Sequence, residues 1–458
     1  MTKALNAVIG FLKSPIYPIF IGAVVLTSHI FGLEAICAPI IVISCMLVLI
    51  LCDSAEYTIA PIVLFTYLLS RAHTPTTPTY SDYLLSPLPL TVIILMCVGL
   101  LASVVYFFIK DGRYKRIKLS GEPIFTSLLF FILTLFISAL FSGEYVLNNL
   151  AFAAVEAAAF IIPFLLFRFG IPKERSAHEL CDRLSYVALI SSAVIVLELL
   201  HLYMTTDVLT NGSLNKEAIT LGWGIWNSVG GMLTLALPLL FLGAVKTKHT
   251  ALYLSGAVVA YVAAVLTLSR NALLFGTLFF GVCCIICTLF GEKKKLFRWL
   301  LLILVCLLAI FLLAFSSKIA DILADYINRG FSDNGRFALW KASVSAFFEN
   351  VFTGVGFHAY DGEYYQFAAF MPKLPHNTPL ALLGGGILVF AAYALYRAYT
   401  LLPFIKRPSL YKTLLGLTVL MLIMQSLLDN FIFNFYPTFM YTAAICIAQR
   451  FGENADMR

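Results

Sequence analysis

The sequence has 458 residues, of which 61% are hydrophobic and only 12% are charged. Soluble domains carry roughly 25% charged residues, so this composition excludes an ordinary soluble protein and indicates a chain that uses the lipid bilayer as its solvent. The net charge of +7 does not indicate a nucleic-acid partner, because the basic residues stand in short clusters between apolar runs, as in cytoplasmic loops.

Apolar segments long enough to cross a bilayer recur along the whole chain. A spanning helix needs about 20 largely apolar residues, and about 14 segments reach or nearly reach that length. The second and third segments are the least certain, so a total of 12 spans is the alternative. We therefore predict an all-α fold, a polytopic transmembrane helical bundle that forms one membrane domain over residues 1–458. The approximate limits of the segments are 16–32, 35–52, 56–72, 89–109, 123–142, 146–167, 185–204, 227–245, 250–269, 271–290, 297–316, 379–402, 410–428 and 432–449.

The basic residues predict the orientation of this bundle. With the amino terminus in the cytoplasm, 23 of the 31 Lys and Arg residues fall on the cytoplasmic side and 8 on the other. This is the asymmetry of the positive-inside rule. If one predicted pair of spans is removed from the count, the side assigned to each remaining loop stays the same. We therefore expect cytoplasmic ends at 1–16 and 450–458.

One loop on the outward side, residues 317–377, is much longer than the others. Loops of that length in a compact protein are usually functional or disordered. Here Phe337, Trp340, Val344 and Phe347 recur at helical spacing, which predicts an amphipathic helix over 336–350 that lies against the membrane or the bundle. We expect Asp333 or Asn334 to cap its start, and the turn at 354–356 to follow its end.

Arg270 and Arg336 are the cations of greatest interest on the outward side. Arg270 stands between two apolar segments that leave almost no loop, where the guanidinium group could receive a phosphate or carboxylate at the membrane surface. A lipid-surface anchor would explain it equally simply. Arg336 begins the predicted loop helix, with Lys341 and Arg329 as weaker neighbours, and a solvated loop charge is the simple alternative.

His376 directly precedes the span that begins near Pro379. A histidine held at the lipid surface has a pKa suited to proton transfer near neutrality, although a hydrogen-bonded residue at a helix entry is the plain alternative. Asn227 opens another span and is explained well enough as a helix cap. His358 is a weaker second histidine.

Other polar residues carry less weight. Three ionisable residues inside spans are too scattered for a proton relay; these are Glu156, Glu198 and His201. The outward acidic residues match no metal motif, and the chain has no P-loop or dinucleotide fingerprint. We expect no metal and no cofactor. The outward acids are Asp321, Asp325, Asp333, Asp361, Glu363 and Asp429.

The order of these motifs resembles the bacterial O-antigen ligase and O-antigen polymerase family. The resemblance rests on Leu-Ser-Arg-Asn-Ala at 268–272, Gly-Arg-Phe-Ala-Leu-Trp at 335–340, Gly-Val-Gly at 354–356, Pro-His-Asn at 375–377 and Gly-Gly-Gly-Ile at 384–387. It covers about a quarter of the chain, and the segment around Asn227 resembles a further family motif. The amino-terminal third carries no diagnostic motif.

The resemblance implies an integral-membrane glycosyltransferase that needs neither a metal nor a nucleotide sugar. Its donor would be a glycan on undecaprenyl diphosphate, and its acceptor a glycan or lipid-linked glycan; other polysaccharide-assembly proteins are possible partners. By position, His376 would activate the acceptor hydroxyl, while Arg270 and Arg336 would neutralise the diphosphate. Asn377, Asn227 and Lys341 would contribute to substrate binding.

Three functions remain open at this point. We favour polymerisation of a surface polysaccharide (O-antigen, capsule or wall polymer) narrowly over ligation, because nothing in the sequence indicates a lipid-core acceptor. A transporter or flippase of lipid-linked or small solutes is the alternative, but it should show internal repeats and paired intramembrane charges. A structural scaffold is the third.

Overall fold

The computed structural model confirms the all-helical membrane bundle. It describes residues 2–69, 90–118, 120–142, 146–206, 209–210, 213–214, 218–221, 224–314, 316–317, 320, 324, 336–354, 356 and 376–456. Most of the outward loop predicted at 317–377 lies outside these residues. So do Asp333 and Asn334, the expected helix caps, and Arg329 and His358.

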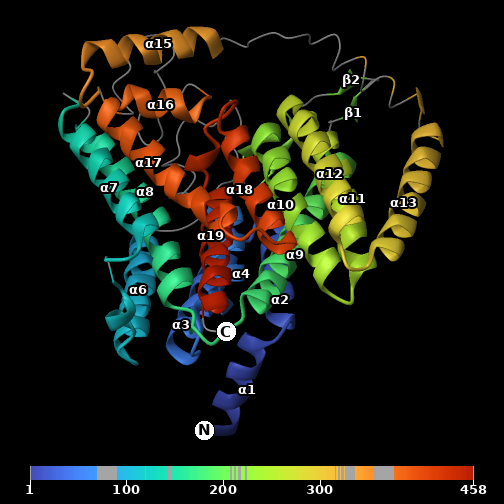
Figure 1. Ribbon diagram of the computed structural model, residues 1–458, viewed down its shortest axis with the longest axis horizontal. Helices are drawn as coiled ribbons and strands as arrows, with labels where there is room; N and C mark the ends of the chain where they lie inside the picture. Colours follow the sequence, from blue (N-terminus) through green and yellow to red (C-terminus); the bar gives the residue numbers. More distant parts are fainter. Residues whose placement is uncertain are drawn as a thin grey trace.

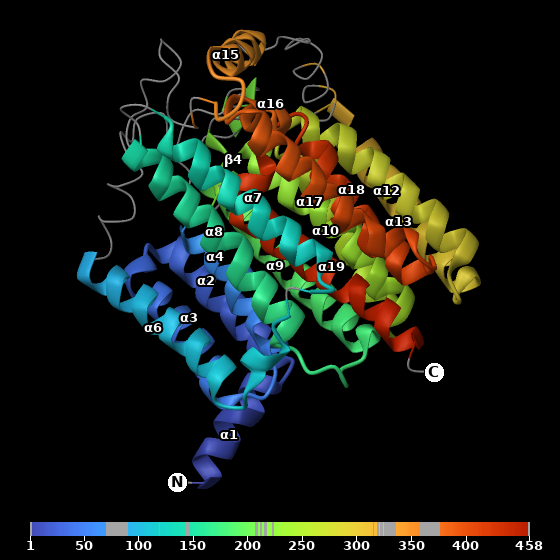
Figure 2. The ribbon, with the colours of Figure 1, turned by 60° about the vertical axis from the view of Figure 1, so that its left-hand side comes forward.

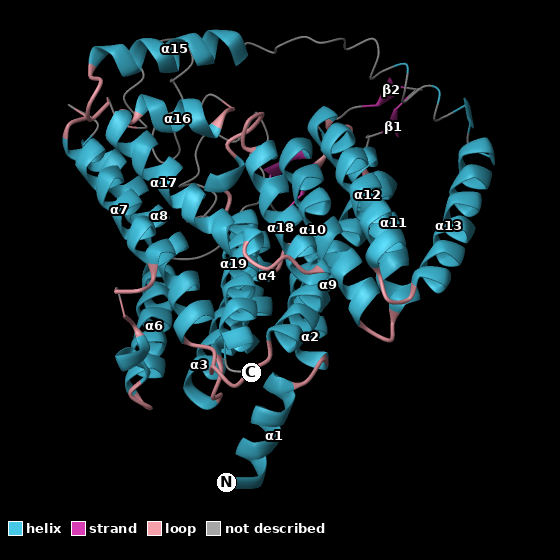
Figure 3. Cartoon of the chain, viewed as in Figure 1, coloured by secondary structure: helices cyan, strands magenta, loops and turns pink. Residues whose placement is uncertain are grey.

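Helices account for nearly all of the regular structure in the described residues (Figure 3). Two short antiparallel hairpins interrupt them, β1–β2 (Leu209–Thr210 with Ser213–Leu214) and β3–β4 (Thr220–Leu221 with Gly224–Ile225). The α-helices are α1 (Thr2–Lys13), α2 (Ile16–Phe31), α3 (Glu34–Leu51), α4 (Ile59–Leu69), α6 (Leu90–Ile109), α7 (Pro123–Leu140), α8 (Val146–Phe169), α9 (Ala177–Thr205), α10 (Trp226–Lys246), α11 (Thr250–Leu266), α12 (Arg270–Phe290), α13 (Lys294–Ala314), α15 (Arg336–Glu349), α16 (Thr378–Gly384), α17 (Ile387–Ile405), α18 (Leu410–Gln425) and α19 (Phe435–Asp456). The 3₁₀ turns are η1 (Ala55–Thr58), η2 (Arg113–Arg116) and η5 (Phe431–Phe433).

Within the described residues, eight helices are long and apolar enough to cross a membrane. The number rises to nine if the bent pair α1 and α2 forms one span. Shorter apolar helices, including α11 and α18, pack inside the same bundle. The fold class is therefore confirmed, while the number of 12 to 14 spans stays a prediction.

Helix α10 forms the centre of the bundle. It packs against α9, α11, α12 and α18, and nearly all of its length is buried. Glycines allow this close packing, because a Cβ atom at Gly243 would lie 2.4 Å from the Tyr253 ring. The outer helices, by contrast, expose large apolar side chains such as Leu95 of α6 and Leu313 of α13, which suits contact with lipid.

Two helices lie across one end of the bundle. In Figures 1 and 2, α15 runs over that end with α16 directly beneath it, and α1 and the last turns of α19 lie at the opposite end. The predicted loop helix over 336–350 is thus confirmed as α15. Ser343 is fully buried on its inner side, whereas Phe337 and Phe348 are exposed.

The structure corrects one predicted span. The segment 379–402 is not a single helix, since it divides into α16 and α17 at Gly385 and Gly386. Gly386 has a φ of +95°, a conformation that breaks a helix and favours glycine. Similarly, the chain bends by 76° between α1 and α2.

On the side of the bundle opposite α15, cationic side chains donate hydrogen bonds to carbonyl groups at the carboxyl ends of helices. Lys110 donates to the carbonyl oxygens of residues 49, 50 and 52 at 2.8–3.1 Å, at the end of α3. Arg450 donates to those of residues 171 and 172 at 2.6 and 2.7 Å, beyond the end of α8. A positive charge is favourable at a helix carboxyl end, so part of the basic clustering seen in the sequence has a structural role.

Candidate active site

His376 and Asp429 form a pair at the end of the bundle that α15 covers. The Nδ1 atom of His376 lies 3.0 Å from Oδ1 of Asp429, and the side chains are 35% and 20% exposed. The two residues are 53 positions apart in the sequence. Their pairing joins the entry of α16 to the turn after α18.

The charge state of Asp429 fixes the tautomer of its partner. Burial on its own would raise the pKa of the Asp429 carboxyl, but the hydrogen bond from His376, and the charge of that ring whenever it is protonated, lower it. The backbone N–H of Asn430 and the charge of Arg336 act in the same direction, so the pKa lies below its usual range. An ionised carboxylate only accepts hydrogen bonds. Nδ1 of His376 therefore carries the proton, and Nε2 of the neutral ring is left as an acceptor and base.

The backbone around His376 is held in an uncommon conformation. His376 has a φ of +50°, which lies in the left-handed region that few non-glycine residues adopt. The next residue, Asn377, is fixed by two side-chain hydrogen bonds. Its Oδ1 accepts from the Leu380 N–H at 3.0 Å, and its Nδ2 donates to the Leu427 carbonyl at 2.9 Å. Asn377 thus caps α16 and ties it to the turn after α18, which positions the adjacent imidazole.

Arg336 begins α15 and acts on this pair through its charge. Its charge is one of those that lower the pKa of Asp429. The position of α15 is set at its other end, where the N–H of Ile387 donates to the Val351 carbonyl at 2.8 Å. Helix α15 is therefore fixed to the break between α16 and α17. Lys341, five residues further along α15, points roughly 140° away from Arg336 around the helix and is exposed.

Arg270 begins α12 after a tight turn of three residues. Leu268 in that turn has a φ of +58°, an uncommon conformation for a leucine. Ser269 holds the turn: its Oγ accepts from the Ala272 N–H at 3.3 Å and donates to Oδ1 of Asn227 at 2.8 Å. Asn227 thereby helps to position the turn that carries Arg270. An arginine at the amino end of a helix adds its charge to the positive end of the helix dipole, which makes the spot attractive to an anion.

The first turns of α10 connect the two halves of the site. A Cβ at Gly230 would lie 2.6 Å from both Ala272 and Thr267, and one at Gly231 would lie 2.5 Å from the Phe431 ring. One glycine therefore packs against the Arg270 turn, and its neighbour against the segment just after Asp429. Such close packing holds both halves at the same end of the bundle.

The segment with most of these residues matches a known family. Residues 255–394 match the family model described as O-antigen ligase. Over this segment, the chain is similar to the O-antigen ligase family. The matched segment runs from α11 to α17 and contains Arg270, Arg336, Lys341, His376 and Asn377. No curated protein matches the chain.

The match to the O-antigen ligase family indicates a role in surface polysaccharide biosynthesis, as a membrane enzyme similar to a glycosyltransferase. In that family a lipid-linked glycan is the general donor and a glycan is the general acceptor. Asn227 and Asp429 lie outside the matched segment. The sequence offers no local signal for Asp429, which appears there only as one of several outward acids. Its contact with His376 exists only once α16 and α18 have packed.

The structure also shows polar residues deep in the bundle. Glu198 of α9, which the sequence singled out, is buried and hydrogen-bonds to Nδ1 of His29 in α2. Arg397 of α17 was not singled out, yet it is only 7% exposed, and its guanidinium stacks on the rings of Tyr393 and Tyr441.

Proposed function

We propose that this protein transfers or polymerises undecaprenyl-diphosphate-linked oligosaccharide units on the outer face of the cytoplasmic membrane. The observation that carries the proposal is the pairing of His376 with Asp429, whose pKa is lowered by that pairing and by the charge of Arg336. Such a pair supplies a base with a defined free nitrogen at the end of a membrane bundle. A lipid-linked donor requires a site of this kind, because its diphosphate stays at the membrane surface.

In the proposed reaction, His376 acts as the general base. Nε2 takes the proton from an acceptor sugar hydroxyl, and the hydroxyl oxygen attacks the anomeric carbon of the donor. The bond between that carbon and the diphosphate oxygen breaks, so undecaprenyl diphosphate leaves with the electron pair. Asp429 stabilises the imidazolium that forms and holds the ring in place.

Arg336 and Arg270 would stabilise the leaving group. The diphosphate gains negative charge as the glycosidic bond breaks, and guanidinium groups already in place stabilise that charge most where water is scarce. The strained turn at Leu268 and the Asn227 bond to Ser269 keep Arg270 in position. Lys341 and Asn377 would contribute less directly: Lys341 lies on another side of α15, and the Asn377 side chain is engaged in capping.

Polymerisation of a surface polysaccharide is the form of the reaction that we favour. The test uses purified protein in detergent with lipid-linked repeat units and no added nucleotide. We expect longer glycans from the natural protein and at least a hundredfold lower rate from His376→Ala, since a general base typically contributes 10²- to 10⁴-fold.

Matched variants make the test specific. Arg270→Ala and Arg336→Ala should lose activity, while His249→Ala and Arg116→Ala, which change exposed residues at the opposite end of the bundle, should retain it. Unchanged activity in all three site variants, at normal protein levels, would overturn the mechanism. If the donor is unchanged but crosses a vesicle membrane, the protein is a transporter instead.

A further inference from the structure

Asn430 contacts both members of the His376–Asp429 pair or their immediate backbone. Its backbone N–H donates to Oδ1 of Asp429 at 2.8 Å, and its side-chain Oδ1 accepts from the Asn377 N–H at 3.1 Å. The Asn377 N–H belongs to the rigid peptide group that follows His376. One residue therefore holds the carboxylate and also the backbone of the imidazole. Asn430 lies outside the segment that matches the family model.

The side chain of Asn430 does not serve its own helical turn. Asn430 directly precedes the 3₁₀ turn η5, a position where asparagine often accepts a hydrogen bond from a backbone N–H of the turn that follows. Within the described residues, its side chain makes no such cap. It accepts instead from the entry of α16, 53 positions earlier in the sequence. The contact therefore has a role outside η5.

The turn that carries Asn430 is firmly based in the bundle. All three residues of η5 are buried, and a Cβ atom at Gly231 of α10 would lie 2.5 Å from the Phe431 ring. The carbonyl of Asn430 accepts from the Phe433 N–H at 3.1 Å. Since the backbone on this side of Asn430 is fixed, its amide side chain can impose a position on the entry of α16.

His376 is the member of the pair whose backbone depends on such a contact. Its φ of +50° is a conformation that few non-glycine residues adopt. The Asn377 side chain and the Thr378 N–H also bind carbonyl groups of the turn, but neither belongs to the peptide group that follows His376. Among the hydrogen bonds of the described residues, the one to Asn430 Oδ1 orients that peptide group, and with it the direction of the imidazole.

We propose that Asn430 is a positioning residue, which sets the angle at which His376 meets Asp429 by holding the Asn377 N–H. The inference rests on the proposed function, in which Nε2 of His376 is the base. Proton transfer depends steeply on geometry, and a misplacement of about 1 Å can cost on the order of a hundredfold in rate. Asn430 touches no reacting atom in this scheme, so its side chain affects the chemical step and not substrate binding.

The first test needs no substrate. Hydrogen–deuterium exchange of the full-length protein in detergent, resolved to single residues by fragmentation in the mass spectrometer, measures the protection of the Asn377 amide. Asn430→Leu has a similar branched shape without an acceptor, so this amide should exchange about tenfold faster or more. Asn430→Asp keeps an acceptor oxygen and should restore the protection. Unchanged exchange in Asn430→Leu would overturn the proposal.

The second test is a double-mutant cycle on glycan transfer from lipid-linked repeat units. Asn430→Leu should lower kcat about 10- to 100-fold and leave KM within about twofold, and Asn430→Asp should recover most of the rate. In a His376→Ala background, Asn430→Leu should change the remaining rate by less than about twofold, because the group that Asn430 positions is absent. A merely structural role would lower the rate by the same factor in both backgrounds, and that result would contradict the proposal.

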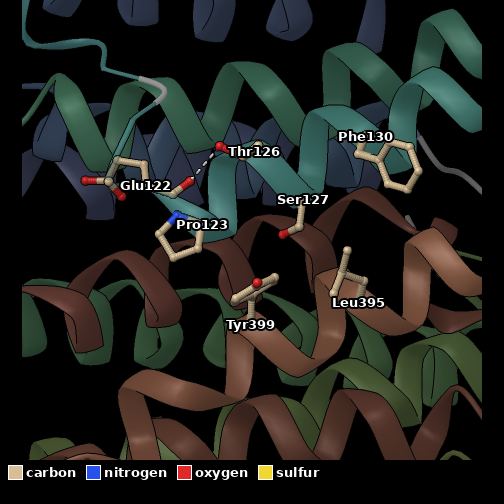
Figure 4. A pocket seen from close by; sticks show the side chains of 8 residues that line it. Glu122, Pro123, Thr126, Ser127, Phe130, Leu395 and Tyr399 are labelled. Atoms are coloured by element: carbon tan, nitrogen blue, oxygen red, sulfur yellow. Dashed lines mark hydrogen bonds between the residues drawn. The ribbon is translucent and has the colours of Figure 1, made fainter.

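Two control variants should have no effect in either test. Asn434, four residues further along the chain, makes its hydrogen bonds in the described residues through its backbone, so Asn434→Ala should change neither the exchange at Asn377 nor kcat. Tyr399→Phe alters a groove between α7 and α17, where Tyr399 faces Pro123 and Ser127 (Figure 4). Tyr399 lies in the half of α17 away from α16, so both measurements should stay at their natural values.

Failure of this inference is distinguishable from failure of the proposed function. If His376→Ala transfers glycan at the natural rate, the proposed function fails and the inference fails with it. If His376→Ala loses activity while Asn430→Leu keeps the natural kcat, Asn430 is not a positioning residue and the proposed function stands.

Discussion

Gly354 and Gly386 meet backbone to backbone, and this contact sets the position of the helix that carries Arg336. A Cβ at Gly354 would lie 2.2 Å from the Gly385 carbonyl carbon, and one at Gly386 would lie 2.5 Å from the Gly354 nitrogen. Both glycines have positive φ angles, +66° and +95°. The end of α15 and the break between α16 and α17 therefore fit together only without side chains, which accounts for the Gly-Val-Gly and Gly-Gly-Gly-Ile motifs.

Gly386→Ala should displace α15 and reduce activity together with stability. The added methyl group meets backbone atoms that cannot move aside, and the left-handed conformation itself costs about 1 kcal/mol or more for a non-glycine residue. We expect a lower unfolding temperature and a reduced glycan-transfer rate. Gly281→Ala in α12 is the control, because a Cβ atom added there would meet no atom of the described residues within 4 Å beyond its own helix, and alanine favours a helix by about 1 kcal/mol. Equal behaviour of the two variants would contradict the role given to this contact.

Hydropathy could predict most of the bundle because the bilayer imposes one requirement on every span. Each backbone polar group must be satisfied inside its own helix, so apolar length alone located α7 and α10 to within a few residues. The break at Gly386 could not be found in this way. Its cause is a close approach by Gly354, a residue distant in the sequence.

The candidate site was predictable only where a motif was local. Arg270, Arg336 and His376 each stand in a recognisable short sequence, and the structure pairs His376 with Asp429, whose pKa the charge of Arg336 also lowers. Asp429 has no such motif, since its role depends on the packing of α18 against the entry of α16. Arg397 was missed for a similar reason: Tyr393 is one turn away on α17, but Tyr441 of α19 becomes its neighbour only in the fold.

The His376–Asp429 pair should make stability depend on pH in a definite direction. The pKa of Asp429 is lowered from its ordinary value of 3.8 in the folded protein, so the ionised form favours folding. Its contribution is fully present above the ordinary value and is lost as the pH falls through the lower folded pKa. Asp429→Asn removes this contribution. As the pH falls below about 4, where Asp429 itself begins to take up a proton, the difference in unfolding temperature between the two proteins should shrink.

A matched acid gives the control for that measurement. Asp53 is more exposed and pairs with Lys13 at 2.7 Å at the other end of the bundle, so Asp53→Asn should change stability by no more than about 1 kcal/mol. A difference for Asp429→Asn that grows on acidification would show that the sign assigned to this pair is wrong.

The buried His29–Glu198 pair should be sensitive to the loss of either partner. The side chains are 9% and 3% exposed. The polar atoms outside the pairing contact, Nε2 of His29 and Oε2 of Glu198, have no hydrogen-bond partner among the described residues. His29→Ala would leave Glu198 buried alone, at a cost of about 3–5 kcal/mol. The double variant His29→Leu with Glu198→Met should recover most of that loss in a thermal-unfolding cycle. A double variant no more stable than His29→Ala would contradict this.

Arg397 and Arg450 are both buried arginines, but replacement by methionine should affect them in opposite ways. The Nε, Nη1 and Nη2 atoms of Arg397 have no hydrogen-bond partner among the described residues, and its charge is compensated there by stacking on Tyr393 and Tyr441 at 4.9 and 4.5 Å. Such stacking contributes about 2 kcal/mol when desolvated. Removing the charge from water costs several kcal/mol, so stacking does not offset that cost fully. Arg397→Met should therefore leave the unfolding temperature unchanged or raise it.

Arg450→Met should instead destabilise the protein strongly. The guanidinium of Arg450 donates to the Pro172 and Ile171 carbonyls at 2.7 and 2.6 Å, and methionine would leave the buried Ile171 acceptor and the part-buried Pro172 acceptor without this donor. Each unsatisfied group costs about 1–3 kcal/mol. Thermal unfolding of both variants in the same detergent measures the contrast. A large loss of stability in Arg397→Met would mean that the tyrosine cage binds the cation tightly enough to make Arg397 a structural residue.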